Sequence, residues 1–132
     1  MEARFKLRKI VAGLAHLAEV AAVAEPAEQD QVVVSPGAFD WLRERYGPHA
    51  VVDRTTNSEL IAEAVAGARY ALAHVPGRDR AMRVTLTMIG DSPVDTGDGD
   101  IKLAAAEAVA AALGGRMEPA PYLGANGAVF PD

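Results

Sequence analysis

Ser92 is the residue whose setting most suggests chemistry. It ends the run Gly90-Asp91-Ser92, which directly follows an expected strand over residues 83–89. A serine becomes an acyl nucleophile only when a base removes its proton and a third group orients that base. All three histidines of the chain precede it in sequence: His16, His49 and His74. The run therefore predicts a polar turn, and a nucleophile only if the fold brings a histidine to Ser92.

The same run resembles the Gly-Asp-Ser block of the SGNH esterases, whose serine is the nucleophile. In that family the block follows the first strand, and the base histidine lies near the C-terminus, three residues after an aspartate. This chain has the run on a late strand and no such aspartate-histidine pair. The resemblance implies one alternative function, a small serine hydrolase using Ser92 with Asp91 or Asp95.

Four aspartates follow or overlap this run: Asp91, Asp95, Asp98 and Asp100. A helix-loop-helix calcium site needs oxygens at alternating positions, a central glycine and a glutamate at position twelve, and these aspartates miss that register. We expect Thr96, Asp98 and Asp100 to cap and complement the N-terminus of the next helix instead. The histidines lack metal-ligand spacing and the chain has no cysteine, so we expect no metal and no cofactor.

Basic residues alternate with apolar ones in the first expected strand, over residues 3–12. Arg4, Lys6 and Arg8 fall on one face, while Phe5 and Leu7 fall on the other. This basic face, with Arg78, Arg80 and Arg83, could contact RNA phosphates, or it could be a solvated sheet face balanced by carboxylates. The net charge of −5 argues against a general nucleic-acid binder but leaves room for a local patch.

The remaining patterns place further elements around these residues. Residues 15–24 fit a strand or a helix, and 31–35 read as a short strand. A short amphipathic helix is expected over 38–46. The clearest helix, 57–74, opens with the capping-box pattern Thr56-Asn57-Ser58-Glu59. A last helix is expected over 100–113. This order predicts an α+β fold: a small mixed β-sheet with helices packed on one face.

Length and composition limit the class of protein. The 132 residues suffice for one domain with a core and are too few for two. No apolar run reaches the roughly 18 residues of a membrane-spanning helix, and the charged N-terminus does not resemble a signal peptide. The absence of cysteine fits a reducing compartment. We therefore expect a cytoplasmic protein with no membrane association.

Four segments together resemble domain IV of the ribosomal translocase, elongation factor G. They are a glycine- and arginine-bearing helix over 61–72, a Val-Thr-Leu strand over 83–86, the turn Pro93-Val94-Asp95, and a strand that ends in Glu25-Pro26. The last of these favours strand over helix for residues 15–24. The resemblance implies the fold of the second domain of ribosomal protein S5, with residues 1–132 as one domain.

The resemblance also implies a role, although this chain differs from the family at several positions. Domain IV of that family reaches the decoding centre of the ribosome with loops at its tip. Here the glycine-rich first loop is reduced to residues 12–15, and Ser92 stands where the family usually has histidine. Residues 38–53 resemble an insertion, and 117–132 read as an extended tail. No Gly-x-x-x-x-Gly-Lys-Ser/Thr run exists, so the chain lacks a GTPase phosphate cradle.

The resemblance implies a stand-alone, non-catalytic binding or accessory module that contacts RNA, a ribosome or a protein partner. The residues predicted to make that contact are Arg4, Lys6, Arg8, Ser92, Pro93 and Asp95. The oligomeric state stays open, because exposed strands in the first third or the tail could pair two chains into a dimer.

Overall fold

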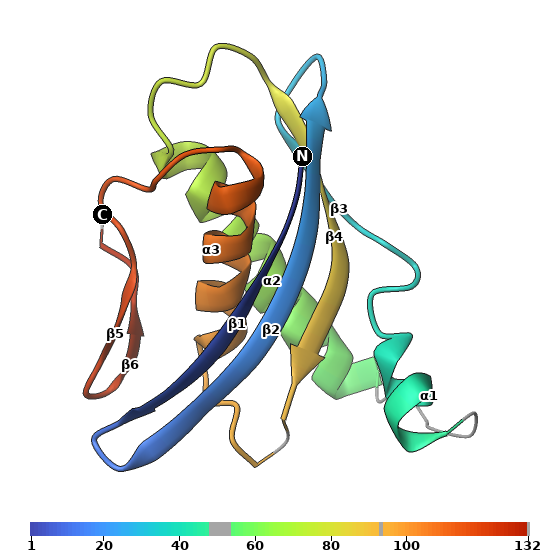
Figure 1. Ribbon diagram of the computed structural model, residues 1–132, viewed down its shortest axis with the longest axis vertical. Helices are drawn as coiled ribbons and strands as arrows, with labels where there is room; N and C mark the ends of the chain where they lie inside the picture. The colour runs from blue at the N-terminus through green and yellow to red at the C-terminus, as the bar shows by residue number, and fades with distance from the viewer. Residues whose placement is uncertain (48–53, 93, 132) are drawn as a thin grey trace.

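The computed structural model describes residues 1–47, 54–92 and 94–131, with the side chains of all but residues 54–57. The elements in chain order are β1 (Glu2–Val11), β2 (Leu14–Pro26), β3 (Gln31–Val34), α1 (Trp41–Tyr46), α2 (Arg54–His74), β4 (Met82–Asp91), α3 (Asp100–Ala112), β5 (Tyr122–Gly124) and β6 (Gly127–Val129). Helices α2 and α3 lie on one side of the sheet, and the β5–β6 hairpin lies beyond α3 (Figure 1). The predicted α+β class is confirmed.

The main sheet has four strands in the order β1-β2-β4-β3. Strands β1 and β2 pair antiparallel from Glu2↔Val23 to Val11↔Leu14, and β2 pairs antiparallel with β4. Strand β3 runs parallel to β4, so the sheet is mixed, as expected. The β1–β2 turn is tight because Ala12 and Gly13 adopt φ of 51° and 79°, the backbone twist that suits two-residue hairpin loops.

One face of the sheet is covered by α2 and α3 and the other is open, and successive side chains of each strand point to alternate faces. In β1, Leu7 is buried, and Ala3 and Phe5 are half-buried against the core. Arg4, Lys6 and Arg8 are exposed on the opposite side, as the period-two pattern predicts. We call the side of the sheet away from α2 and α3 the open face.

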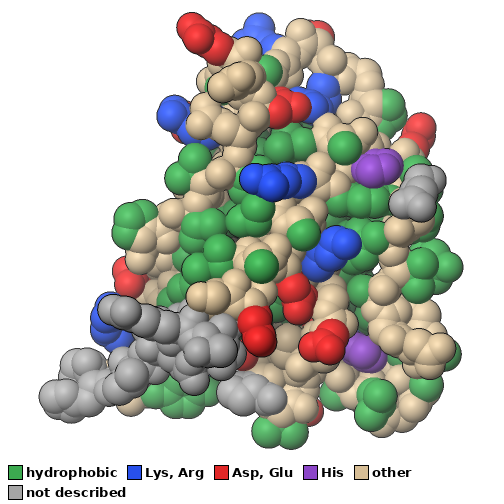
Figure 2. Space-filling view, turned by 180° about the vertical axis from the view of Figure 1, so that it is seen from behind, with side chains coloured by type: hydrophobic (Ala, Val, Ile, Leu, Met, Phe, Trp, Pro, Cys, Tyr) green, Lys and Arg blue, Asp and Glu red, His purple; other side chains and the backbone are tan. Residues whose placement is uncertain are grey.

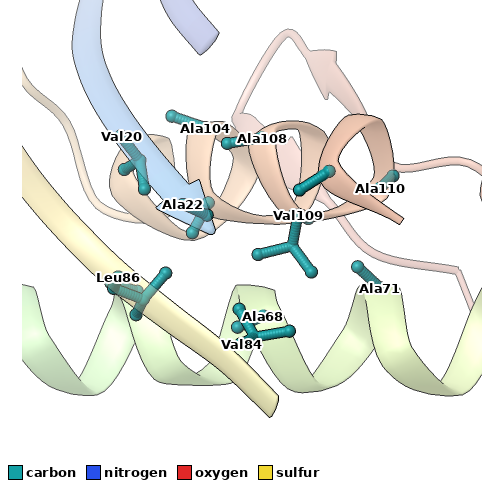
Figure 3. Close-up of a cluster of buried hydrophobic side chains, with 14 of the residues drawn as sticks. Val20, Ala22, Ala68, Ala71, Val84, Leu86, Ala104, Ala108, Val109 and Ala110 are labelled. Atoms are coloured by element: carbon teal, nitrogen blue, oxygen red, sulfur yellow. The ribbon is translucent and has the colours of Figure 1, made fainter. Parts of the chain in front are cut away.

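The core lies between the sheet and the two long helices, and alanine supplies much of it. Val20 and Ala22 of β2 and Val84 and Leu86 of β4 meet alanines from α2 and α3 (Figure 3). Ile61 is half-buried against this cluster, while Val84 and Ile101 are fully buried in it. The segments around Ile61, Val84 and Ile101 therefore share one core.

Two predicted helix starts differ from the structure. Helix α2 begins at Arg54 rather than Asn57, so the Thr56–Glu59 run lies inside the first turns, and the side chains of Thr56 and Asn57 lie outside the described ones. Helix α1 begins at Trp41 rather than at the predicted residue 38, and it has half-buried Trp41 and Leu42 but no fully buried side chain. Residues 48–53 of the expected insertion lie outside the described residues.

The tail from residue 117 is more ordered than an extended segment. It forms the β5–β6 hairpin and is attached to α2 by the Tyr70 hydroxyl, which donates to the carbonyls of Pro119 (2.6 Å) and Pro131 (2.8 Å). Phe130 meets the Tyr70 ring edge-on at 5.0 Å. Aromatic packing against a helix therefore orders a segment that the sequence predicts as an extended tail. None of the described helices is long and apolar enough to cross a membrane.

Candidate functional site

A groove of about 560 Å³ opens on the open face, between α1, the middle of β1, the first half of β2 and the end of β4. Its strand side is formed by Lys6, Arg8, Leu17 and Glu19, and its helix side by Trp41, Glu44 and Arg45. Met88 and the run Gly90–Ser92 close the end nearest the β4–α3 loop. The groove combines apolar, aromatic and charged groups, as binding surfaces for extended ligands do.

Hydrogen bonds to Ile89 hold α1 as the wall of this groove. The Trp41 indole Nε1–H donates to the Ile89 carbonyl at 2.7 Å, and the Ile89 amide donates to the Ala38 carbonyl at 3.0 Å. These bonds satisfy both backbone groups of a buried strand residue at once. The half-buried Trp41 ring is thereby fixed, and the Arg45 guanidinium lies over it at 5.6 Å from the ring centroid.

The cations of the strand side differ in their pairing. Arg4 forms an ion pair with Glu19 at 3.4 Å, and Arg83, farther along the open face, pairs with Glu25 at 3.1 Å. Within the part of the chain that the structure describes, Lys6 and Arg8 form no ion pair. These two cations line the groove and remain available to an anionic ligand.

Carboxylates also line the groove, so its charge is mixed. Glu19 is engaged with Arg4, while Glu44 is exposed on α1. Burial raises the pKa of the Asp91 carboxyl above its usual value, because desolvation disfavours the charged form. The groove therefore suits a ligand that offers both anionic groups and a stacking surface, rather than a simple polyanion.

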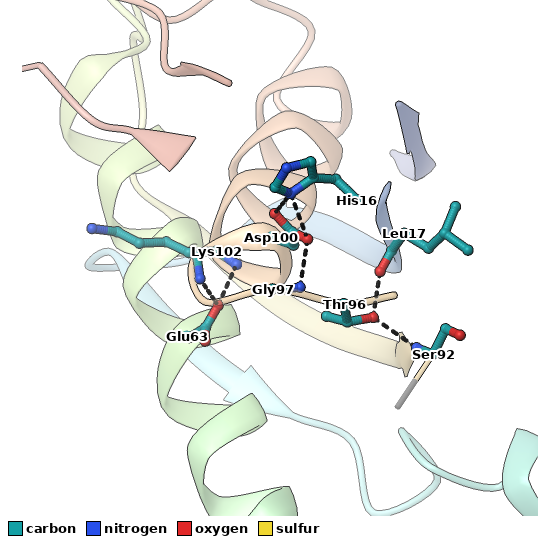
Figure 4. A network of polar contacts seen from close by, with 9 residues as sticks. His16, Leu17, Glu63, Ser92, Thr96, Gly97, Asp100 and Lys102 are labelled. Carbon is teal, nitrogen blue, oxygen red and sulfur yellow. Dashed lines mark hydrogen bonds and ion pairs between the residues drawn. The ribbon is translucent and has the colours of Figure 1, made fainter. Parts of the chain in front are cut away.

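The β4–α3 loop is tied to β2 beside the groove (Figure 4). The Ser92 amide donates to Thr96 Oγ at 2.7 Å, and the Thr96 hydroxyl donates to the Leu17 carbonyl. The Leu17 amide in turn donates to the Asp95 carbonyl at 2.9 Å. This network fixes Ser92 at the groove and leaves Val94, with 92% of its surface exposed, at the tip of the loop.

The structure brings together three of the residues predicted to contact a partner. Lys6, Arg8 and Ser92 line the same groove. Arg4 lies beside the groove, because it pairs with Glu19, which lines it. Asp95 lies in the loop that closes one end of the groove. Pro93 lies outside the described residues.

His16 and Asp100 form a buried pair that the sequence patterns alone do not predict. His16 Nδ1 lies 2.9 and 3.1 Å from the two Asp100 carboxylate oxygens, and Asp100 Oδ2 also accepts from the Gly97 amide at 2.7 Å. His16 is 6% exposed and Asp100 fully buried. The sequence does indicate that His16 is buried, because side chains alternate along β2 and His16 falls on the same face as the buried Ala18 and Val20.

The N-terminus of α3 is capped by Glu63 from α2, which corrects the prediction that Thr96, Asp98 and Asp100 cap it. Glu63 Oε1 accepts from the Gly99 amide at 3.0 Å and the Lys102 amide at 3.3 Å. Burial raises the pKa of the Glu63 carboxyl, although both amide hydrogen bonds oppose that shift. Thr96 instead bonds β2, and Asp100 bonds His16 and the Gly97 amide.

Neither described histidine supplies a base to Ser92. His16 directs Nδ1 to Asp100, and His74 donates Nδ1–H to the Tyr70 carbonyl at 2.8 Å while stacking on that ring. In Figure 4 the His16 ring and the Ser92 side chain point away from each other. His49 lies outside the described residues, as do any contacts it makes.

No cluster of three or more metal-ligating side chains occurs among the described residues. The Asp91, Asp95, Asp98 and Asp100 series is thus not gathered around one point. Asp100 faces His16 in the interior, whereas Asp98 is exposed.

Comparisons with known proteins define the class of fold and no more. No family model matches the chain, and no curated protein matches it. The chain is similar to a crystal structure of a protein from Thermus thermophilus, with a TM-score of 0.58 and 16% sequence identity over 83% of this chain. The match spans 15% of the length of that Thermus protein. At this identity the likeness establishes a shared α+β fold.

Proposed function

We propose that this domain is a non-catalytic docking module, as its resemblance to domain IV of elongation factor G implies, and that it binds single-stranded RNA in the groove beside α1. The observation that carries the proposal is that Lys6 and Arg8 line one groove with Trp41 and form no ion pair within the described residues. Such a module would act on RNA in the cytoplasm, with ribosomal RNA as the first candidate ligand.

The groove has the two components that single-stranded RNA binding requires. Lys6, Arg8 and Arg45 can neutralise phosphates, and the fixed, half-buried Trp41 ring would stack on a base if the Arg45 guanidinium, which lies over it, moves to a phosphate. Glu19, Glu44 and Asp91 in the same groove limit how many phosphates it can accept. We therefore expect modest affinity, restricted to a short segment of RNA.

On the opposite side of the molecule, the described residues carry charges of both signs. Figure 2 shows the face turned away from the viewer in Figure 1, where Lys and Arg side chains are interspersed with Asp and Glu among the coloured atoms. Interspersed charges give no continuous basic surface on that view. This supports the groove, rather than a general surface field, as the RNA contact.

Fluorescence anisotropy with a labelled single-stranded RNA tests the proposal. We expect the Lys6→Ala/Arg8→Ala variant to bind about tenfold more weakly at low salt, because it removes two cations that each contribute about 0.7 kcal/mol. The matched control is Arg69→Ala/Arg116→Ala, which removes two exposed cations outside the groove and should bind as the parent does. Equal weakening in both variants would mean that net charge, and not the groove, determines binding.

A further inference from the structure

The outer edge of β1 is a second binding feature, formed by backbone groups. Strand β1 is the terminal strand of the four-stranded sheet, and the β5–β6 hairpin on the same side of Figure 1 forms a separate sheet. In the described part of the chain, no hydrogen bond outside the β1–β2 ladder involves the backbone of Glu2–Val11. An open edge of this length is a template for another strand.

The phase of the β1–β2 ladder identifies which backbone groups are free. Met1 and Ala24 exchange two hydrogen bonds. The Met1 ammonium donates to the Ala24 carbonyl at 2.5 Å, and the Ala24 amide donates to the Met1 carbonyl at 2.8 Å. The register from residue 2 to residue 11 has no shift, and hydrogen-bonded pairs alternate along an antiparallel ladder. Hence the even-numbered residues of β1 direct their amides and carbonyls away from β2.

These same residues carry the basic side chains. Arg4, Lys6 and Arg8 therefore present free backbone groups along the edge and cations on the open face. In an added antiparallel strand, the residue opposite each of them would form a hydrogen-bonded pair with Cα atoms about 5.5 Å apart, and its side chain would lie beside the cation.

A second copy of this chain is a poor occupant of this edge. In the longest antiparallel registers between two β1 strands, Lys6 would lie opposite either Lys6 or Arg8 of the second copy. Like charges directly opposite each other destabilise a strand pair. The charge pattern thus works against self-pairing and favours a strand of opposite sign.

We propose that the β1 edge binds an extended segment of a partner protein that carries Asp or Glu at alternate positions, opposite Arg4, Lys6 and Arg8. Apolar residues between those acids would lie beside the half-buried Ala3 and Phe5 on the helix-covered side. This partner goes beyond the proposed RNA function and depends on the backbone edge, not on the groove. Since both ligands use Lys6 and Arg8, they would compete.

The test uses the whole chain and a labelled seven-residue peptide with three glutamates at alternate positions separated by valines. A control peptide has the same composition with its glutamates adjacent. We expect the alternating peptide to bind at least tenfold more tightly than the control. N-methylation of the alternating peptide at its glutamates should abolish binding, because it removes the amides that face β1.

Two variants of Lys6 distinguish the contribution of the backbone amide to peptide binding from that of the positive charge. Lys6→Gln removes the cation alone, whereas Lys6→Pro also removes the outward amide, a change that edge strands tolerate. We expect Lys6→Pro to weaken peptide binding about tenfold more than Lys6→Gln, with folding of both checked by circular dichroism. RNA binding should respond equally to the two variants, so the failure of either proposal can be recognised without the other.

Three outcomes would overturn the strand proposal. They are equal binding of the two unmethylated peptides, unchanged binding of the N-methylated peptide, and a dimer seen by light scattering that Lys6→Pro converts to monomer. The last result would show a second copy on the β1 edge. The N-methylated peptide decides the question even if Lys6→Pro fails to fold.

Discussion

Gly67 of α2 lies directly against the backbone carbonyl of Lys102 in α3. A Cβ added at Gly67 would stand 2.1 Å from that oxygen and 3.0 Å from the Cβ of Ala105. The two helices that cover the sheet can approach this closely only because residue 67 has no side chain. The glycine of the helix motif therefore determines the position of α3, and with it the loop that closes the groove.

We predict that Gly67→Ala destabilises the domain by about 1–3 kcal/mol, the usual range for overpacking. The sign is diagnostic, because a glycine-to-alanine change inside a helix normally stabilises it by about 1 kcal/mol. Urea unfolding measures the change. Ala66→Gly, at the exposed neighbouring position, reports helix propensity alone. A Gly67→Ala variant as stable as the parent would contradict the contact.

Glu63 should matter for the attachment of α3 to α2. Glu63→Ala removes the acceptor of the Gly99 and Lys102 amides, and we predict a loss of about 0.5–2 kcal/mol, as for other helix N-caps. Glu63→Gln retains one carbonyl acceptor and should cost less. Chemical unfolding of the two variants beside the parent measures the difference, and equal losses would reject the capping role.

The pH dependence of the Glu63 contribution follows from its raised pKa. Between the unfolded-state pKa of about 4.5 and the higher folded-state pKa, the folded protein binds more protons than the unfolded chain, so stability falls as pH rises. We predict that Glu63→Gln gains stability relative to the parent as pH increases through this window. Urea midpoints at several pH values check this, and a constant difference would contradict it.

The His16–Asp100 pair should be among the more sensitive polar contacts. Asp100→Ala leaves the His16 ring N–H and the Gly97 amide without their acceptor, and we predict a loss of about 2–3 kcal/mol from these buried donors. Asp98→Ala, at an exposed position in the same loop, should change stability by less than about 0.5 kcal/mol. Similar thermal unfolding midpoints for the two variants would contradict this assignment.

Ser92 is predicted to remain unlabelled by a fluorophosphonate probe. Its amide is used by Thr96, and neither His16 nor His74 hydrogen-bonds to it, so no described base activates its hydroxyl. Intact-mass spectrometry after incubation measures labelling, with Ser92→Ala as the control. A stoichiometric adduct that Ser92→Ala abolishes would instead support the serine hydrolase interpretation.

Periodicity in the sequence predicted the parts of this fold that depend on local patterns. Arg4, Lys6 and Arg8 alternate with apolar residues, and the sheet separates them accordingly. The contacts that build the site depend on partners far apart in the chain. His16 and Asp100 are separated by 84 positions, and Trp41 and Ile89 by 48. Nothing in either local pattern identifies the other member, so these pairs required the tertiary structure.

The salt dependence of RNA affinity tests the central claim most directly. For single-stranded RNA, the slope of log Kobs against log salt decreases in magnitude by about 0.7 for each phosphate that the protein no longer neutralises. We predict that Lys6→Ala/Arg8→Ala reduces the slope by about 1.4, twice that amount, while Arg69→Ala/Arg116→Ala leaves it unchanged. An unchanged slope in the Lys6/Arg8 variant would show that RNA, if bound at all, does not lie in this groove.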